Sequence, residues 1–396
     1  MLSVEQALEK LLAAAQPVAD VESVDTMLAA GRVLATEVIS SIDVPPLDNS
    51  QMDGYAVRTV DVPAVPTTLR ISQRVAAGQV GVALMPETAA RIFTGAPIPA
   101  GADAVIMQEK CSALGDKVTL NEQPKRGDAI RGAGIDIARG QTVLQPGVRL
   151  QPQHCALAAS IGAAKLTVFR RLRVATFFTG DELVMPGEPL PPGRIYNSNR
   201  FMLRGLLESL GCEVHDLGIV PDDLQMTRDA LTSAAVLADL IISSGGVSVG
   251  EEDHVKPAVQ AEGTLDLWQI AMKPGKPLAF GQVRGVPFIG LPGNPVSSFV
   301  TFVLFARPFI LRRQGRAESL KTLSLRADFD WTESSRRREF MRARLNERNG
   351  LDIFPNQNSS VLTSVVWADG LIDNPAEHPI RAGDLVRFLP LAELQS

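Results

Sequence analysis

Residues 238–256, ADLIISSGGVSVGEEDHVK, give the clearest indication of how the chain folds. Its apolar run, residues 240–242, is short and continuous and stops at Ser243-Ser244-Gly245-Gly246, which is typical of a buried parallel strand. Glycines at the carboxyl end of such a strand let backbone N–H groups approach a phosphate closely. The acids at 251–253 would repel that phosphate unless a divalent cation lay between them. The stretch therefore predicts a magnesium-assisted site for a phosphorylated small molecule. The alternative is a glycine-rich turn beside a solvated acidic helix start.

The same strand-then-turn rhythm extends outward from this stretch. Strands are expected at 172–178, 213–220, 265–272, 278–282 and 286–291, with helices at 199–210 and 222–237 and another beginning at Asn294. Such alternation predicts a doubly wound parallel sheet, which binds ligands at the carboxyl ends of its strands. The loops TGDE, SSGGVSVG, KPGKP and LPGNP all fall at these ends. We therefore expect the loops to share one site.

The flanking regions have a different texture. Residues 1–15, 24–35 and 146–164 show helical patterns, whereas short β-like runs separated by Gly/Pro turns fill the region from about 45 to 145. After about residue 316, alternating runs at 322–329, 339–345, 351–354 and 384–389 predict antiparallel strands. The expected multidomain α/β plus β architecture has a discontinuous helical/linker domain (1–44 and 137–170), an inserted β module (45–136), an α/β ligand-binding domain (171–316) and a C-terminal β-barrel-like domain (317–396).

Composition excludes several classes of protein. A chain of 396 residues needs more than one core. Its net charge of −5 argues against sequence-independent nucleic-acid binding, which needs a broad basic face. The three cysteines and four histidines are scattered without zinc-type spacing, as expected for reduced thiols in a cytoplasmic protein. No signal-peptide pattern opens the chain, and the apolar run at 296–311 predicts a buried helix rather than a membrane span.

Charged residues cluster at the predicted strand ends. Lys273 and Lys276 lie on a segment stiffened by prolines and could face one anion, and the alternative is two solvated lysines in a turn. Asn294, Pro295 and Ser297 open a helix whose free N–H groups suit an oxyanion. Acids at 181–182, 222 and 251–253 suggest magnesium, while each one alone is equally a helix cap or a surface charge. Alternation places Arg338, Arg342 and Arg344 on one strand face, where they could bind an oxyanion in a fork or simply form a solvated edge. The Asp53 and Thr94 loops are unusually polar for a β module.

With these segments assembled, the chain resembles the molybdopterin molybdotransferase family, which includes MoeA and the gephyrin E domain. The matching motifs, in family order, are DNSQMDGYAV, IFTGAPIPAGADAVIMQE, TGDEL, IYNSNR, SSGGVSVGEEDHVK, MKPGKPLAFG and GLPGNPVS. The resemblance implies a homodimer of four-domain subunits whose site is completed across the subunits. It also implies a transferase that inserts molybdate into adenylylated molybdopterin with Mg²⁺-dependent loss of AMP, giving molybdenum cofactor. Molybdopterin adenylyltransferase and acceptor molybdoenzymes are the partners that it suggests.

The family's functional positions are carried over motif by motif. Catalytic positions fall on Asp53, Thr94, Asp136, Glu182, Asp222 and Asp253, and of these Glu182, Asp222 and Asp253 would hold the metal. Substrate-binding positions fall on Ser244, Gly245, Gly246, Ser248, Gly250, Lys273, Lys276, Pro292, Gly293, Asn294, Pro295, Ser297, Arg342 and Ser359. The chain departs from the family pattern at Ile135, Asn197, His254 and Gln269. The loss of a frequent Lys at Gln269 removes a positive charge near the site.

Other functions remain open on sequence grounds. The preceding adenylyltransferase resembles the α/β domain alone, so the additional domains argue against it. A nucleotide pyrophosphatase could use the same glycine loop but would not need molybdate. A scaffold whose C-terminal domain binds a partner peptide is the candidate from a different class.

Overall fold

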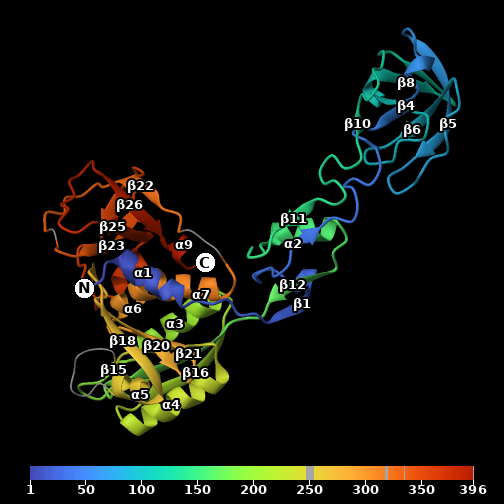
Figure 1. Ribbon diagram of the computed structural model, residues 1–396. Coiled ribbons are helices and arrows are strands. Elements are labelled where there is room, and N and C mark those ends of the chain that lie inside the picture. Colours follow the sequence, from blue (N-terminus) through green and yellow to red (C-terminus); the bar gives the residue numbers. More distant parts are fainter. Residues whose placement is uncertain (247–253, 317–319, 334, 396) are drawn as a thin grey trace. The chain divides into compact units, whose positions relative to one another are not determined.

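The computed structural model describes residues 1–246, 254–316, 320–333 and 335–395, and the chain divides into two compact units (Figure 1). Unit 1 comprises Met1–Glu22, Gly31–Ala35 and Val168–Ser396, and unit 2 comprises Ser23–Ala30 and Thr36–Thr167. The finer division into four domains stays a prediction.

Unit 1 contains a six-stranded sheet that places the predicted loops. Its order is β16 (Glu213–Val220), β13 (Arg173–Thr179), β17 (Leu240–Ser244), β21 (Val286–Leu291), β20 (Pro277–Val283) and β18 (Gly263–Gln269). The first four strands are parallel, as predicted, but β20 and β18 run antiparallel to their neighbours, so the expectation of a wholly parallel sheet is wrong. Arg284 and Gly285 join β20 to β21, both with positive φ (49° and 84°), and a two-residue turn of this kind reverses the chain into a hairpin.

Helices cover both faces of this sheet, because successive strand residues point to opposite sides. Ile242 and Ile289 belong to one apolar cluster, and Ile241 and Phe288 to another. The first cluster includes residues of α3 (Ser198–Ser209), α6 (Pro295–Thr301) and α7 (Arg307–Arg313). The second includes residues of α4 (Leu224–Leu237) and α5 (Val255–Glu262). The sheet is therefore a central layer between helices.

The longest helix in the described part of the chain is a core element. It spans Pro295–Arg313 as α6, a π-helical turn (Phe302–Ala306) and α7, and it passes a length-and-hydropathy test for crossing a membrane. However, 78% of its most apolar window is buried inside the protein. The buried helix predicted at 296–311 is confirmed.

The C-terminal part of unit 1 forms the predicted second sheet. Its order is β19 (Met272–Lys273), β23 (Arg338–Leu345), β25 (Gly370–Asn374), β26 (Leu385–Pro390) and β22 (Leu323–Arg326), and β24 (Leu351–Ile353) also pairs with β23. Its pairs are antiparallel except for β19 with β23, and a bridge joins Ala327 to Leu351. The short helices α8 (Thr363–Trp367) and α9 (Leu391–Leu394) accompany it. The first helix, α1 (Val4–Ala13), packs through Val4, Ala7 and Leu11 into the core of unit 1.

Unit 2 is mainly β structure, as predicted for the region that starts near residue 45. Its six-stranded sheet has the order β7 (Ala104–Met107), β4 (Gly54–Val57), β6 (Thr88–Ile92), β5 (Thr67–Val75), β9 (Lys117–Leu120) and β8 (Cys111–Leu114). Short pairs join β3 (Asn49–Ser50) to β10 (Ile130–Arg131) and β2 (Val38–Ile39) to β11 (Thr142–Leu144).

Two helix predictions near unit 2 need correction. The helix expected at 24–35 is absent: β1 (Val21–Asp25) pairs with β12 (Lys165–Phe169), and only a short 3-10 turn (Thr26–Leu28) follows it. Gly31 adopts φ = 82°, a conformation that favours glycine and does not continue a helix. The helix expected at 146–164 is limited to α2 (Pro152–Ser160).

Candidate functional site

A cavity of about 790 Å³ opens at the carboxyl ends of the parallel strands of unit 1. It is lined by residues that follow β13, β17 and β21, by the start of α3, and by Ser360 and Leu362 of the C-terminal part. The predicted residues that it brings together are Glu182, Asp222, Ser244, Gly245, Gly246, Pro292, Gly293, Asn294, Pro295 and Ser297. Pro277, from the KPGKP segment, also lines it. The expectation that separate loops share one site is met for these residues.

The two described glycines of SSGGVSVG are required by space as well as by conformation. Gly245 and Gly246 adopt φ values of 97° and 65°, which L side chains rarely adopt. A Cβ on Gly245 would lie 2.6 Å from the carbonyl oxygen of Thr179, and one on Gly246 would lie 2.3 Å from Cγ2 of Val255. The backbone after β17 therefore passes too close to its neighbours to carry side chains. Ser248, Gly250 and Asp253 lie outside the described residues.

Asn199 was not predicted as a site residue, yet it connects the loops after two strands. Its Nδ2 donates to Ser244 Oγ (2.9 Å) and to the carbonyl oxygen of Gly293 (2.8 Å). Ser244 Oγ in turn donates to the carbonyl oxygen of Pro292 (3.1 Å). These bonds hold the ends of β17 and β21 together. The polar run NSNR, which supplies the N-cap and first turn of α3, is the sequence signal that could have identified this residue.

Several buried polar atoms around the cavity have no hydrogen-bond partner within the described part of the chain. They are Thr179 Oγ1, Asn197 Nδ2 and Asn199 Oδ1, all on residues that line the cavity or lie at its wall. Asn197 is only 2% exposed, and its Oδ1 is already used as it accepts from the backbone N–H of Arg200 (3.1 Å). A buried unpaired polar group costs about 1–3 kcal/mol, so these atoms are suited to bind a polar ligand.

Glu182 and Asp222 place carboxylates in the same cavity. Asp222 Oδ2 accepts from the backbone N–H of Asp181 (3.0 Å), and Asp181 Oδ1 accepts from the backbone N–H of Asp222 (3.3 Å). This reciprocal pair fixes the loops after β13 and β16 against each other. The described residues hold no cluster of three or more His, Cys, Asp or Glu side chains suited to a metal. Two carboxylates nonetheless fit Mg²⁺, which usually takes one or two carboxylates together with substrate phosphates.

Neither predicted lysine is among the residues that line the cavity. Lys273 Nζ lies 3.1 Å from Glu339 Oε1, and the Glu339 side chain is only 3% exposed. Trp331 Nε1 donates to the other carboxylate oxygen of Glu339 (3.2 Å). Lys276 is exposed, directly before the cavity residue Pro277. Both lysines therefore lie just before a cavity residue in the sequence. Their contact with substrate stays a prediction.

The sequence left two readings open for the β23 arginines, a solvated edge and an oxyanion-binding fork, and each guanidinium has partners within the protein. Arg338 pairs with Asp373, Arg344 lies 4.5 Å from the Trp367 ring centre, and Arg342 is 1% exposed. Arg342 donates to Ser364 Oγ (3.1 Å) and to its neighbour's carbonyl at Phe340 (3.1 Å), and burial lowers its pKa to about 10. Its role in substrate binding stays a prediction.

Ser359 lies next to the cavity rather than in its described lining. Its carbonyl oxygen accepts from the backbone N–H of Val296 (3.0 Å) at the start of α6. Ser360 and Leu362, just after it, line the cavity. The loop thus ties the C-terminal part of unit 1 to the helix that opens the site.

The remaining predicted residues, Asp53, Thr94 and Asp136, belong to unit 2. Asp53 Oδ1 accepts from both the backbone N–H and the hydroxyl of Thr94, each at 2.8 Å. The backbone bond, followed by the hydroxyl bond, lowers the pKa of Asp53, and the charge of Arg91 acts in the same direction. Asp136 is exposed and donates its backbone N–H to the carbonyl oxygen of Val44 (3.0 Å).

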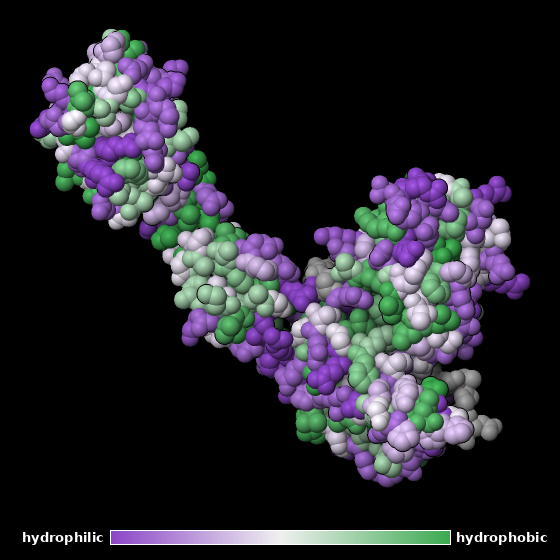
Figure 2. Space-filling view, turned by 180° about the vertical axis from the view of Figure 1, so that it is seen from behind, coloured by the Kyte–Doolittle hydropathy of each residue, from purple (hydrophilic) through white to green (hydrophobic). Residues whose placement is uncertain are grey.

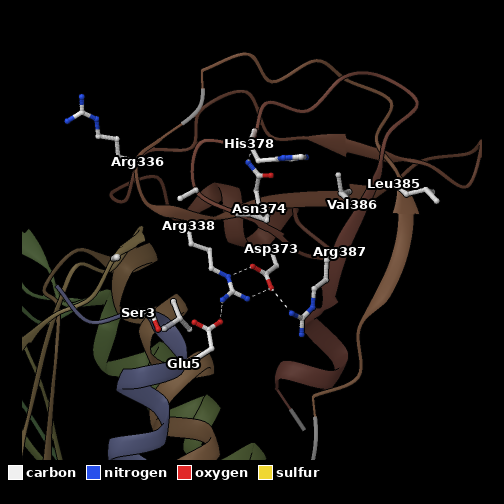
Figure 3. Close-up of a pocket in the computed structure, with 14 residues that line it drawn as sticks. Ser3, Glu5, Arg336, Arg338, Asp373, Asn374, His378, Leu385, Val386 and Arg387 are labelled. Carbon is white, nitrogen blue, oxygen red and sulfur yellow. Dashed lines mark hydrogen bonds and ion pairs between the residues drawn. The ribbon is translucent and has the colours of Figure 1, made fainter.

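A second cavity of unit 1, of about 620 Å³, lies between the start of α1 and the C-terminal sheet (Figure 3). Four of its charged residues form one network of ion pairs. Arg338 donates to both carboxylate oxygens of Asp373 (2.5 and 2.7 Å) and also pairs with Glu5, while Arg387 lies 3.3 Å from Asp373. The network joins α1 to β23, β25 and β26, which is a structural task.

A third, more apolar groove of about 1240 Å³ adjoins the first cavity and shares Tyr196, Ser198 and Leu362 with it. Phe201, Leu323, Leu345 and Val366 are large apolar residues of this groove that are exposed to solvent. In the face shown in Figure 2, hydrophobic residues also gather over the middle of unit 1. Apolar patches of this kind mark interaction sites.

Comparison with protein-family models matches almost the whole chain. The matching models are the MoeA N-terminal region (domain I and II) at residues 2–162, a probable molybdopterin binding domain at 175–312, and the MoeA C-terminal region (domain IV) at 324–391. The second of these spans the sheet and the glycine loops that form the first cavity. Fold and site thus define a molybdopterin-binding protein.

Named relatives make the identification more specific. The chain is 44% identical to the molybdopterin molybdenumtransferase of Haemophilus influenzae, over 80% of this chain and 79% of that protein. It is 38% identical to molybdopterin molybdenumtransferase 2 of Mycobacterium tuberculosis, over 88% and 89%. Two structures of the molybdopterin biosynthesis MoeA protein of Pyrococcus horikoshii superpose with TM-scores of 0.85 and 0.87, at 31% and 28% identity, over 98% of this chain and 99% and 100% of those chains. The chain belongs to the MoeA family of molybdopterin molybdenumtransferases, enzymes of molybdenum cofactor biosynthesis. The resemblance in the sequence motifs is thereby confirmed.

Proposed function

We propose that the cavity at the carboxyl ends of β13, β17 and β21 binds adenylylated molybdopterin beside molybdate. The single observation that carries the proposal is the convergence of the TGDE, SSGG and LPGNP segments on one cavity. The backbone at Gly245 and Gly246 and the unpaired polar atoms at its wall suit a phosphorylated, polar ligand. AMP is the group that leaves when molybdate enters the dithiolene.

Glu182 and Asp222 are the described residues that would hold Mg²⁺, together with Asp253 outside the described part. A Mg²⁺ ion held by these carboxylates would supply positive charge that stabilises a bound pyrophosphate. The reciprocal Asp181–Asp222 backbone bonds orient the Asp222 carboxylate before substrate arrives. The residues proposed to bind the molybdate oxyanion are Lys273, Lys276, Ser297, Arg342 and Ser359.

We further propose that the enzyme works as a homodimer in which Asp53 and Thr94 of one subunit complete the cavity of the other. The exposed apolar groove that adjoins the cavity supports a protein partner on this face. Three cysteines, all free, agree with a cytoplasmic enzyme. We also propose the four-domain division, with an inserted β module and a barrel-like C-terminal domain, from the same family resemblance.

The direct test supplies adenylylated molybdopterin, Mg²⁺ and molybdate and follows AMP and molybdenum cofactor together. Glu182→Gln and Asp222→Asn should raise the Mg²⁺ concentration needed for half-maximal AMP release by about tenfold or more. Mutation of residues that only hydrogen-bond to metal ligands already lowers metal affinity by about that factor. Asp229→Asn, which changes an exposed acid on α4, is the matched control. An unchanged Mg²⁺ requirement in both cavity variants would remove these carboxylates from the metal site.

The same assay separates the rival functions. Incubation of the protein with molybdopterin and ATP should give no adenylylated product, which an adenylyltransferase would form. A nucleotide pyrophosphatase would cleave simple dinucleotides without molybdate. Release of AMP that depends on molybdate excludes both.

A further inference from the structure

The Asp53–Thr94 pair of unit 2 is built from two chain segments that must be held in register. Asp53 immediately precedes β4, and Thr94 follows β6 by two residues. The pair itself rests on two hydrogen bonds of 2.8 Å to one carboxylate oxygen, on a part of the surface that is open to solvent. The ladder between β4 and β6, which pairs Gly54 with Ile92, sets the register of the two segments, but Asp53 and Thr94 lie just beyond its end. Exposed bonds contribute little by themselves, so contacts beyond the ladder decide how well the two side chains are held.

Arg91 of β6 reaches the Asp53 side of this pair through hydrogen bonds. Its Nη1 donates to the carbonyl oxygen of Gly54 (3.0 Å), and its Nη2 donates to Gln108 Oε1 (2.6 Å). The backbone N–H of Gln108 donates to the carbonyl oxygen of Asp53 (3.0 Å). Gly54 packs directly against the backbone of β7, since a Cβ there would lie 2.0 Å from the carbonyl oxygen of Ile106.

The same guanidinium reaches the Thr94 side by stacking. It lies 4.7 Å from the ring centre of Phe93, the residue before Thr94, and 5.1 Å from the ring centre of Tyr55. Arg74 also lies over Phe93, at 4.5 Å. Arginine can do this because its planar fork donates in its own plane while its faces stack on aromatic rings.

We propose that Arg91 is a positioning residue, which holds Gly54 and Phe93 and thereby keeps Asp53 and Thr94 in the geometry that the transferase reaction needs. The inference rests on the role proposed above for Asp53 and Thr94. Nothing in the comparisons assigns a task to Arg91. Both the hydrogen bonds and the stacking are needed, so a lysine, which keeps the charge but has no planar fork, does not replace it.

The test compares Arg91→Met and Arg91→Lys with Arg74→Met. The control removes a cation over the same Phe93 ring without touching Gly54 or Gln108. Both Arg91 variants should lower kcat for molybdate-dependent AMP release by roughly 10- to 100-fold, the cost of a small misplacement of a catalytic group, while Arg74→Met stays near wild type. Melting of each variant by calorimetry verifies that unit 2 remains folded.

A double-mutant cycle with Asp53→Asn decides whether Arg91 acts through Asp53. If it does, adding Arg91→Met to Asp53→Asn should cost less than about threefold in kcat, because residues that act as a unit are not additive. Full additivity, or a restored kcat in Arg91→Lys, overturns the positioning role while leaving the proposed function intact. Wild-type turnover by Asp53→Asn alone overturns the role of Asp53 and the inference that rests on it.

Discussion

Replacing Asp239 by Asn tests the stability of the sheet that carries the site. Asp239 lies directly before β17, and its side chain is only 12% exposed. Its carboxylate accepts from Arg170 Nη1 (2.9 Å), from Arg173 Nη2 (3.0 Å) and from the backbone N–H of Arg173 (2.9 Å). An asparagine keeps the size but loses the charge and turns an amide N–H₂ toward a guanidinium. Because bonds to charged groups contribute about 1.5–3 kcal/mol and both arginines are partly exposed, we expect unit 1 to lose about 2 kcal/mol.

The stabilisation by Asp239 should depend on pH in a definite direction. Burial alone would raise the pKa of Asp239, but the hydrogen bonds from Arg170 and Arg173 outweigh it and lower that pKa well below the usual range. A lowered folded-state pKa stabilises the fold above the unfolded value of about 3.9, and this stabilisation is lost as the pH falls. The difference between wild type and Asp239→Asn should therefore stay constant from pH 7 to pH 5 and narrow below about pH 4.

Tryptophan fluorescence is the suitable assay, because all three tryptophans lie in unit 1. A loss of about 2 kcal/mol corresponds to a fall in Tm of about 4–8 °C for a unit of this size. Asp266→Asn, an exposed acid on β18, controls for the change in net charge. Equal unfolding midpoints at pH 7, or a difference that persists undiminished at pH 3.5, would refute the reasoning.

The remaining predictions concern the cavity and its flanks. Gly245→Ala should weaken binding of adenylylated molybdopterin by at least about tenfold, because its Cβ would lie 2.6 Å from the carbonyl oxygen of Thr179; titration calorimetry measures this, and unchanged affinity would contradict it. Lys273→Met should destabilise unit 1 by about 1–3 kcal/mol in urea unfolding, because the buried Glu339 carboxylate loses its cation and keeps only the hydrogen bond from Trp331. Adding Glu339→Gln should restore that stability but not the molybdate affinity, and recovery of both would show that Lys273 has only a structural task. Asn199→Ala should lower kcat for AMP release while leaving Tm nearly unchanged, since the two hydrogen bonds of Asn199 align the ends of β17 and β21. A lower Tm with an unchanged kcat would show that Asn199 contributes to packing alone.

The amino-acid sequence was enough to predict that the TGDE, SSGG and LPGNP loops share one cavity and to place the chain in its family. Glycines, prolines and helix caps affect the backbone over only a few residues. The turn at SSGG after β17 and the helix start at Asn294-Pro295 can therefore be predicted from the sequence. The parallel order of β13, β17 and β21 follows from the helices between them. The seven motifs then placed the chain in a family that the comparisons confirm.

The direction of β20 and β18 and the long-range contacts of the site became apparent only in the folded chain. The Arg284–Gly285 turn reverses the chain between β20 and β21, which makes the sheet mixed. In the sequence this pair does not stand out from the other Gly-containing turns, so the hairpin was not predicted. Lys273 meets Glu339 across 66 positions of sequence, and Asn199 meets Ser244 across 45. Contacts at such separations depend on how the strands pack, which hydrophobic periodicity does not encode, whereas the local conformation of each loop is fixed by the residues that compose it.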